Sequence, residues 1–485
     1  MKRLYDTTSL PHEWIAYAIF IAVAFFSQPL LANEELPDLG NGATTVLNAA
    51  QEYELGLSIM KELEAASALS QDAIVSEYLQ SIGYRLIATQ GQSQTPFYFF
   101  TVKDNSINAF ALPGGFIGIN TGLILATEAE GELAGVIAHE VGHVQQKHIA
   151  RMYEHMGRLR LSTIAGMIAS MLIATQNPQA GTGAMAATLA GTQQKLINFT
   201  RDHEKEADYV GINSLAKGGF DPMGMPAFFH RMYQDTRYYG NHIPEYLLTH
   251  PLTESRLMQA QARAQHFPYK QIPDSLQYHL IQARVLVHSF SSPSEASAHL
   301  AKVLNRGNYR SRLGTLYGYA LALTESGKSS EAKPYLDELL KASPNQPLFQ
   351  LAYAQMEMNT HQPQNAISRL ADTLKDHPGS FPITCLYSEW LIKYNEPHKA
   401  IQILMQQVSH KPVRPQLWNL LSTAYAQAHQ PIQAHMAQSQ YLKLQGDFTG
   451  AMTQLRLAKK ISPSSPQEQQ QVDAQIKEIQ KKLAK

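Results

Sequence analysis

Five consecutive residues, His139-Glu140-Val141-Gly142-His143, combine two imidazoles and a carboxylate at a spacing that suits metal chemistry. Residues four apart on a helix share a face, so His139 and His143 can point at one ion, and Glu140 can reach a water bound to it. Zinc lowers the pKa of such a water to about 7, and a neighbouring carboxylate can take its proton. The spacing predicts metal-assisted hydrolysis. The alternative is a surface helix with paired histidines, because the pattern alone is only moderately specific.

A catalytic zinc needs a third protein ligand, and the stretch from Arg201 to Asp208 offers carboxylates for it. Glu204 and Asp208 are four residues apart and share a helix face. One of them could bind the metal while the other accepts a hydrogen bond from a ligand imidazole. Taken alone, this charged run would be a solvated helix face. Together with the histidine pair upstream, however, a metal-binding role becomes the favoured interpretation of this run.

The elements that must position these residues can be read from the apolar pattern. Phe97 to Val102 is aromatic and β-branched, and Ile107 to Ile119 has a Pro-Gly-Gly turn between apolar runs, so a strand and a hairpin are expected. Glu128 to Arg151 has the periodicity of one long helix. On that helix His148 would lie about half a turn from His139 and point away into solvent. We therefore expect His148 to be exposed.

From about Gln277 the chain repeats with a period of 34 residues. Alanines recur at this interval, and so do prolines: Ala332, Ala366, Ala400 and Ala434; Pro344, Pro378 and Pro412. This period resembles the tetratricopeptide repeat, in which a small residue lets two helices approach and a proline follows the pair. The alternative is a helical bundle without repeats. We expect a repeat domain over 275–467, with no catalytic constellation, and a terminal helix over 468–485 that caps the array or frays.

Composition narrows the class of protein. The chain has 485 residues, enough for two or more domains. Its 40 basic residues balance 40 acidic ones, so the net charge gives no indication of nucleic-acid binding. Its one cysteine, Cys385, excludes a disulfide framework and is expected to be a small buried hydrophobe.

Residues 1–32 have the basic start and apolar run of a secretory signal, with cleavage after Ala32. An uncleaved membrane anchor is the alternative.

The stretch from Leu161 to Gln194 contains no charged residue. Its first apolar part is too short to span a bilayer comfortably, and Pro178 interrupts the stretch. Three interpretations stay open: two short helices and a loop that cover the active site or touch a membrane-embedded partner, ordinary burial in the core, and a true membrane span.

The motifs together resemble the zinc peptidase family that includes HtpX and the CAAX prenyl proteases. The resemblance rests on His139–His143 and on Glu204–Asp208, which follows about 60 residues later. Asn108–Gly115 is similar to the family's upstream hairpin, and Thr249-His250-Pro251 with Arg256 is similar to its downstream motif. A signal peptide in front and repeats behind resemble the periplasmic BepA type, over nearly the whole mature chain.

The resemblance implies roles for these residues. His139, His143 and Glu204 would bind one zinc ion, and Glu140 would be the general base. Asp208 would support catalysis from beside the ligands. His250 resembles a histidine that can occupy the fourth zinc position; such a ligand would displace the nucleophilic water and shut the site. A helix-end histidine before a proline is the simpler alternative for His250.

Three further residues are candidates for substrate binding. The hairpin edge could bind an extended peptide through main-chain hydrogen bonds, with Asn108 and Ala109 at that edge. Simple turn chemistry is the alternative for both. Arg201 could pair with a carboxylate near the site or with a substrate carbonyl, and the sequence does not separate the two.

The expected fold is mainly α: an α+β zincin-like metalloprotease domain with a short β-hairpin or sheet over 33–270, then an all-α repeat solenoid. The resemblance implies a periplasmic zinc endopeptidase that degrades misfolded or stalled outer-membrane proteins and assists their assembly. It implies the lipopolysaccharide-inserting barrel among its clients, the barrel-assembly complex as a partner of the repeats, and peripheral membrane contact. Two alternatives are a latched chaperone or scaffold that does not cut, and an integral membrane peptidase.

Overall fold

The computed structural model describes residues 48–90, 95–151, 193–239, 244–409, 414–461 and 465–483. These residues belong to one compact unit, Thr45–Lys485. The expected signal segment and the uncharged stretch up to residue 192 lie outside the described residues. Within the described ranges, no helix combines the length and the apolar character that crossing a membrane requires.

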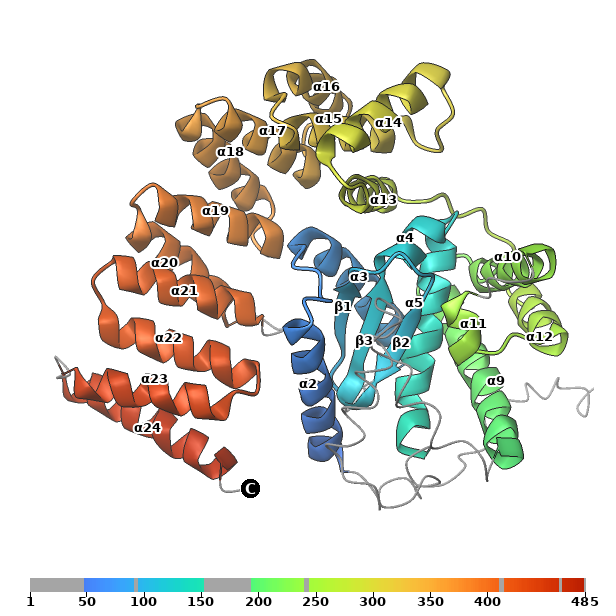
Figure 1. Ribbon diagram of the computed structural model, residues 1–485, viewed down its shortest axis with the longest axis horizontal. Helices are drawn as coiled ribbons and strands as arrows, with labels where there is room; N and C mark the ends of the chain where they lie inside the picture. Colours follow the sequence, from blue (N-terminus) through green and yellow to red (C-terminus); the bar gives the residue numbers. More distant parts are fainter. Residues whose placement is uncertain are drawn as a thin grey trace, which may run out of the picture. The chain divides into compact units, whose positions relative to one another are not determined.

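The first part of the described chain is a three-stranded sheet with helices packed on it (Figure 1). The strand order is β1-β3-β2, with β1 parallel and β2 antiparallel to β3, so the predicted hairpin is confirmed. In the register of the hairpin, Ala109 pairs with Ile119. The elements are α2 (Ala49–Ala65), α3 (Ala73–Ile87), η2 (Ala88–Gln90), β1 (Tyr98–Val102), β2 (Ala109–Leu112), η3 (Pro113–Gly115), β3 (Phe116–Asn120), α4 (Thr121–Ala126) and α5 (Glu130–Gln145).

The turn of the hairpin needs its two glycines. Gly114 and Gly115 have φ angles of 77° and 83°, a region that side chains with a Cβ rarely adopt. A Cβ on Gly115 would also lie 1.9 Å from the carbonyl oxygen of Pro96. The tight turn lets β3 run back along β2. Strand β2 is therefore the edge of the sheet, and it contacts α5.

The helix that carries the two histidines is shorter than predicted. Helix α5 ends at Gln145, the N–H of Gln146 donates to the carbonyl of Gly142, and Lys147 has a φ of 53°. Residues 148–151 are helical again, beyond this break. Lys147 in the left-handed region ends one helical axis and starts another, so 3.6-residue periodicity cannot be extended from His139 to His148.

Helix α9 (Gln193–Lys217) packs against α5 and supplies the carboxylates. The two helices come close at Gly142, where a Cβ would lie 3.1 Å from the carbonyl oxygen of Ala207. A larger side chain there would push α9 and its carboxylates away from the histidines. Three more helices complete this part: α10 (Gly224–Tyr239), α11 (Glu245–Thr249) and α12 (Glu254–Gln265).

The rest of the described chain is helical pairs joined by short turns (Figure 1), as the repeat predicts. The helices are α13 (Leu276–Ser289), α14 (Pro293–Arg306), α15 (Arg312–Glu325), α16 (Ser329–Ala342), α17 (Pro347–Asn359), α18 (Pro363–Asp376), α19 (Phe381–Lys393), α20 (Pro397–Gln407), α21 (Pro415–Gln427), α22 (Pro431–Leu444), α23 (Phe448–Lys460) and α24 (Pro466–Leu483). Ala332, Ala366 and Ala400 are fully buried on second helices, which explains the small residue at the repeat position.

Two smaller features of the repeat half were expected from the sequence. Cys385 is buried on α19, and burial raises its pKa to about 12, which makes it a packed hydrophobe rather than a thiolate. The C-terminal helix α24 packs on α23 and buries Val472 and Ile479. The predicted fold class, mainly α with a small sheet followed by an all-helical repeat solenoid, is confirmed.

The close approach of α5 and α9 leads to a first prediction. Gly142→Val should lower the free energy of unfolding by about 1–3 kcal/mol, because its side chain meets the backbone of Ala207. Urea unfolding followed by circular dichroism measures the change. Gly379→Val is the matched control, since a Cβ there meets nothing within 4 Å. Equal stability of the two variants would contradict the tight contact.

Candidate metal centre

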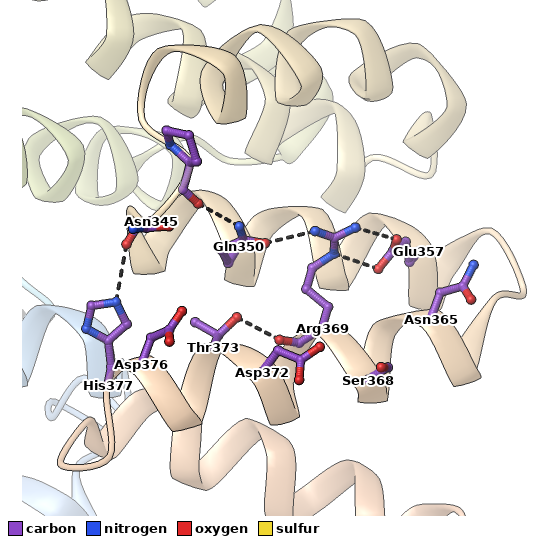
Figure 2. A pocket seen from close by; sticks show the side chains of 11 residues that line it. Asn345, Gln350, Glu357, Asn365, Ser368, Arg369, Asp372, Thr373, Asp376 and His377 are labelled. Atoms are coloured by element: carbon purple, nitrogen blue, oxygen red, sulfur yellow. Dashed lines mark hydrogen bonds and ion pairs between the residues drawn. The ribbon is translucent and has the colours of Figure 1, made fainter.

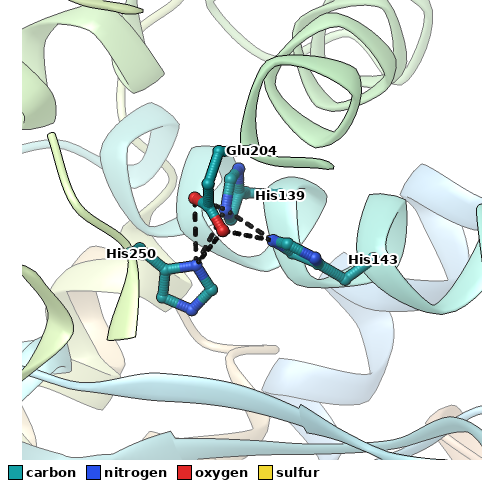
Figure 3. Close-up of side chains that lie close together, drawn as sticks. All are labelled: His139, His143, Glu204 and His250. Carbon is teal, nitrogen blue, oxygen red and sulfur yellow. Dashed lines mark hydrogen bonds and ion pairs between the residues drawn. The ribbon is translucent and has the colours of Figure 1, made fainter. Parts of the chain in front are cut away.

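Four side chains from three helices converge on one point (Figure 3). His139 and His143 come from α5, Glu204 from α9, and His250 caps the C-terminal end of α11. All four are buried, with exposed fractions of 0%, 8%, 2% and 8% in that order. The sequence predicted all four residues for this site, and the fold brings them together.

The distances between the four ligand atoms fit a tetrahedral metal ion. The Nε2 atom of His139 lies 3.0 Å from Nε2 of His143 and 3.3 Å from Nδ1 of His250. Glu204 oxygens lie 3.3 Å from His139, 3.4 Å from His143 and 3.0 Å from His250. An ion with bonds of about 2.0–2.1 Å separates tetrahedral ligands by roughly 3.3 Å. The donor set and its spacing therefore suit a zinc-like ion.

The carboxylate of Asp208 lies behind the ligand set and holds His139. Its Oδ1 is 2.9 Å from Nδ1 of His139, which leaves Nε2 of that ring facing the site. A carboxylate in this position fixes the tautomer and the plane of a ligand imidazole. The geometry matches the supporting position expected for Asp208.

Arg256 brings a positive charge to two of the carboxylates of α9, Asp208 and Glu204. Its guanidinium donates two hydrogen bonds of 2.8 Å to Asp208, and its Nη1 lies 2.9 Å from Glu204. The arginine is 2% exposed. The sequence indicated Arg256 only as part of a downstream motif, and Arg201 was the candidate for pairing with either a carboxylate near the site or a substrate carbonyl. Arg201 is exposed on α9.

Glu140 is completely buried beside the ligand set, as a general base would be. Within the described part of the chain neither of its oxygens has a hydrogen-bond partner, and Oε1 lies 3.4 Å from Nε2 of His250. Burial raises the pKa of Glu140, although the charges of His250 and His139 oppose this. A carboxylate with free lone pairs and a raised pKa is suited to accept a proton from water.

The protonation of the ligands agrees with metal binding. Burial lowers the pKa of His143 to about 3, so its imidazole is neutral and has a lone pair to offer. Burial favours the neutral form of Glu204, but His250 and His143 outweigh it and hold its pKa well below the ordinary value. Burial also acts against a charged His139, yet the carboxylates of Asp208 and Glu204 raise its pKa to about 10. A bound cation would displace that proton.

The residues expected to bind substrate are found at the edge of the sheet but are not free on the surface. Ala109 opens the edge strand β2 with an exposed fraction of 0%, and Asn108 is 2% exposed. The N–H of Asn120 donates to the carbonyl of Asn108, and the N–H of Tyr246 to the carbonyl of Ile107. The main chain at this end of the edge is thus partly occupied by the protein itself.

The expectation that His148 is exposed is wrong. His148 is 3% exposed, and its Nδ1 lies 2.9 Å from Nδ1 of His143. Its Nε2 lies 3.0 Å from a carboxylate oxygen of Glu206, and its ring stacks on His203 at 4.0 Å between centroids. The reason is the break at Lys147, which turns the chain so that His148 folds back toward the metal centre.

The repeat half has a polar recess of about 510 Å³ away from these ligands (Figure 2). The side chain of Arg369 spans it, with two 2.8–2.9 Å hydrogen bonds to Glu357 and one of 2.8 Å to Gln350. Asp372 and Asp376 line its rim. The recess has hydrogen-bonding groups for a polar ligand, but the residues that line it do not form a catalytic constellation.

Arg256 gives the second prediction. Arg256→Met should lower the free energy of unfolding at pH 7 by about 3–5 kcal/mol, because it leaves two buried carboxylates without their cation. The pKa of Asp208 is below its unfolded value of 3.8, so this contribution is present above that pH and declines as the pH falls. Urea unfolding at pH 7 and at pH 3, below the unfolded pKa, measures both effects. Arg312→Met, which breaks an exposed pair with Glu338, is the control and should change little.

The comparisons with known proteins agree with this geometry. Residues 73–264 match the model of peptidase family M48. The beta-barrel assembly-enhancing protease of Yersinia pestis is 32% identical over 93% of this chain and 93% of its own length, and that of Escherichia coli is 32% identical over 92% and 91%. The mitochondrial metalloendopeptidase OMA1 of Arabidopsis thaliana is 30% identical over 32% of this chain and 29% of its own. The chain thus belongs to the M48 metallopeptidases, among relatives of the beta-barrel assembly-enhancing proteases.

Proposed function

We propose that the protein is a zinc-dependent endopeptidase that uses a metal-activated water. The observation that carries this is the convergence of three histidine nitrogens and one carboxylate at tetrahedral spacing, with the unpartnered carboxylate of Glu140 beside them. His139, His143 and Glu204 would hold one zinc ion. When bound, zinc supplies a water of lowered pKa and polarises the scissile carbonyl.

The chain's own residues would move the proton. Glu140 accepts it from the attacking water, which its raised pKa and free lone pairs favour, and then donates it to the leaving amine. Asp208 keeps Nδ1 of His139 occupied, so that Nε2 stays directed into the site. Arg256 keeps Glu204 and Asp208 charged during this cycle.

His250 would act as a latch. Its Nδ1 would occupy the fourth ligand position, where the nucleophilic water would otherwise bind, and its Nε2 lies 3.4 Å from the proposed base Glu140. A site with four protein ligands is of the closed, structural type. Opening the site would therefore require His250 to move away. His250 lies at the end of α11, a helix of only five residues.

Substrate would bind as an extended strand along β2. Main-chain hydrogen bonds at an edge strand involve the backbone of the substrate and not its side chains, which suits unfolded proteins of varied sequence. Ala109 and Asn108 lie where β2 begins, and β2 packs on α5, which carries Glu140. The polar recess of the repeat half supports a role of the repeats in holding proteins.

The relatives suggest where the protein acts. Two of them are named beta-barrel assembly-enhancing proteases and share 32% identity over almost the whole chain. We place this protein in the periplasm, exported by its N-terminal signal. Its clients would be misfolded or stalled outer-membrane β-barrel proteins, including the lipopolysaccharide-inserting barrel. The repeats would dock on the barrel-assembly complex, with peripheral membrane contact, and the protein would assist assembly as well as degrade.

A second candidate function is that of a latched chaperone that no longer cuts. The observation in its favour is that His250 lies within the ligand set and completes four protein ligands. A closed site of this kind could stabilise the fold without hydrolysing anything. The following two experiments separate the candidates.

The third prediction concerns the base. Glu140→Gln should reduce cleavage of an unfolded model protein by at least about 100-fold, because the amide cannot take the proton of the water. A gel-based time course with the zinc-loaded full chain measures it, and a chelator should abolish wild-type cleavage. Glu331→Gln, an exposed change on α16, is the control. Equal cleavage by Glu140→Gln and wild type would refute the assignment.

The fourth prediction concerns the latch. His250→Ala should raise the initial rate of cleavage of the same unfolded protein several-fold, since it frees the fourth ligand position and the neighbourhood of Glu140. His299→Ala, an exposed histidine on α14, is the control and should match wild type. A rate below that of wild type would argue against a latch. Absence of cleavage by both His250→Ala and wild type would favour the chaperone.

A further inference from the structure

The ligand histidine His143 uses both of its ring nitrogens. Its Nε2 faces the ligand set, 3.0 Å from Nε2 of His139 and 3.4 Å from Glu204. Its Nδ1 faces the opposite way and lies 2.9 Å from Nδ1 of His148. This second contact lies outside the ligand set, and the function described above makes no use of it.

The contact between two Nδ1 atoms fixes where the protons are. A neutral imidazole that binds a metal through Nε2 carries its proton on Nδ1. His143 is therefore the donor, and Nδ1 of His148 is the acceptor. Because Nδ1 of His148 then has no proton, its Nε2 carries one, and that Nε2 lies 3.0 Å from Oε2 of Glu206. The chain of hydrogen bonds runs from the ligand to a carboxylate through one intermediate ring.

The surroundings hold this chain in place. The ring of His203 stacks on that of His148 with centroids 4.0 Å apart and planes 9° apart. Arg151 donates to the same oxygen of Glu206 at 3.1 Å, which favours the charged carboxylate. His203 and Glu206 are three residues apart on α9, so they share a face and hold His148 from one side.

We propose that His148, held by Glu206, is a positioning residue for the metal ligand His143. The inference deepens the proposed metallopeptidase function and rests on it. Each ligand histidine would then have its own partner from α9: Asp208 contacts His139 directly, whereas Glu206 acts on His143 through His148. Such a partner sets the ring plane and raises the basicity of the ligand nitrogen. His148 contributes to zinc affinity without touching the metal.

The test is the zinc affinity of the full chain, measured by competition with a chromophoric chelator after the metal has been removed. His148→Phe, which keeps an aromatic ring but has no acceptor, should weaken zinc binding by about 10- to 100-fold. His148→Asn should restore most of the affinity, because its amide oxygen can take the place of Nδ1. His279→Phe is the matched control, a half-buried histidine on α13 that lies 3.9 Å from Asp274 and should leave affinity unchanged.

Several outcomes would overturn the inference. One is wild-type zinc affinity in His148→Phe. Another is an equal loss in His148→Asn and His148→Phe, which would leave His148 a packing role only. Thermal unfolding of the metal-free variants shows whether each is folded; if His148→Phe is not, Glu206→Leu replaces it and should also weaken binding. Failure of the wild type to bind zinc would instead refute the proposed function.

Discussion

The constraint on which the structure depends is the burial of three carboxylates at one place. Glu140, Glu204 and Asp208 are each at most 5% exposed, and buried carboxylates are costly unless cations compensate them. Arg256 supplies one compensating charge, with two hydrogen bonds to Asp208 and an ion pair to Glu204. His139, whose pKa the neighbouring carboxylates raise to about 10, supplies another until a metal ion binds. The site is thus a cluster of negative charge prepared for a cation.

This cluster exists only because α5 and α9 approach closely. Gly142, one residue before His143, faces the backbone of Ala207, so no side chain separates the two helices. The absence of a side chain in the middle of a metal-binding motif costs helix propensity of about 1 kcal/mol relative to alanine. Close packing of α5 and α9 offsets that cost, since it brings Glu204 within 3.4 Å of both ligand histidines.

Much of the site could be predicted from spacing, because residues four apart on a helix share a face whatever surrounds them. That rule puts His139 with His143, and Glu204 with Asp208, on shared helix faces, and the fold brings the four side chains together. It failed at His148, because a single residue with positive φ, Lys147, ends the helix and redirects the chain. Nothing in the sequence marks Lys147 for that conformation. The role of Arg256 was likewise not predictable, since it depends on α12 packing beside α9, a contact between helices far apart in the sequence.

The four ligands are held to different degrees. Three are fixed from outside the ligand set: His139 by Asp208, His143 by His148 and Glu204 by Arg256. Histidine 250 has different contacts. Its Nδ1 lies 3.0 Å from Glu204 and its Nε2 is 3.4 Å from Glu140, so both ring nitrogens face residues of the candidate site. It ends a helix of five residues. Among these four residues, only the departure of His250 would leave all three supporting contacts intact, and it would free the fourth position and Glu140 together.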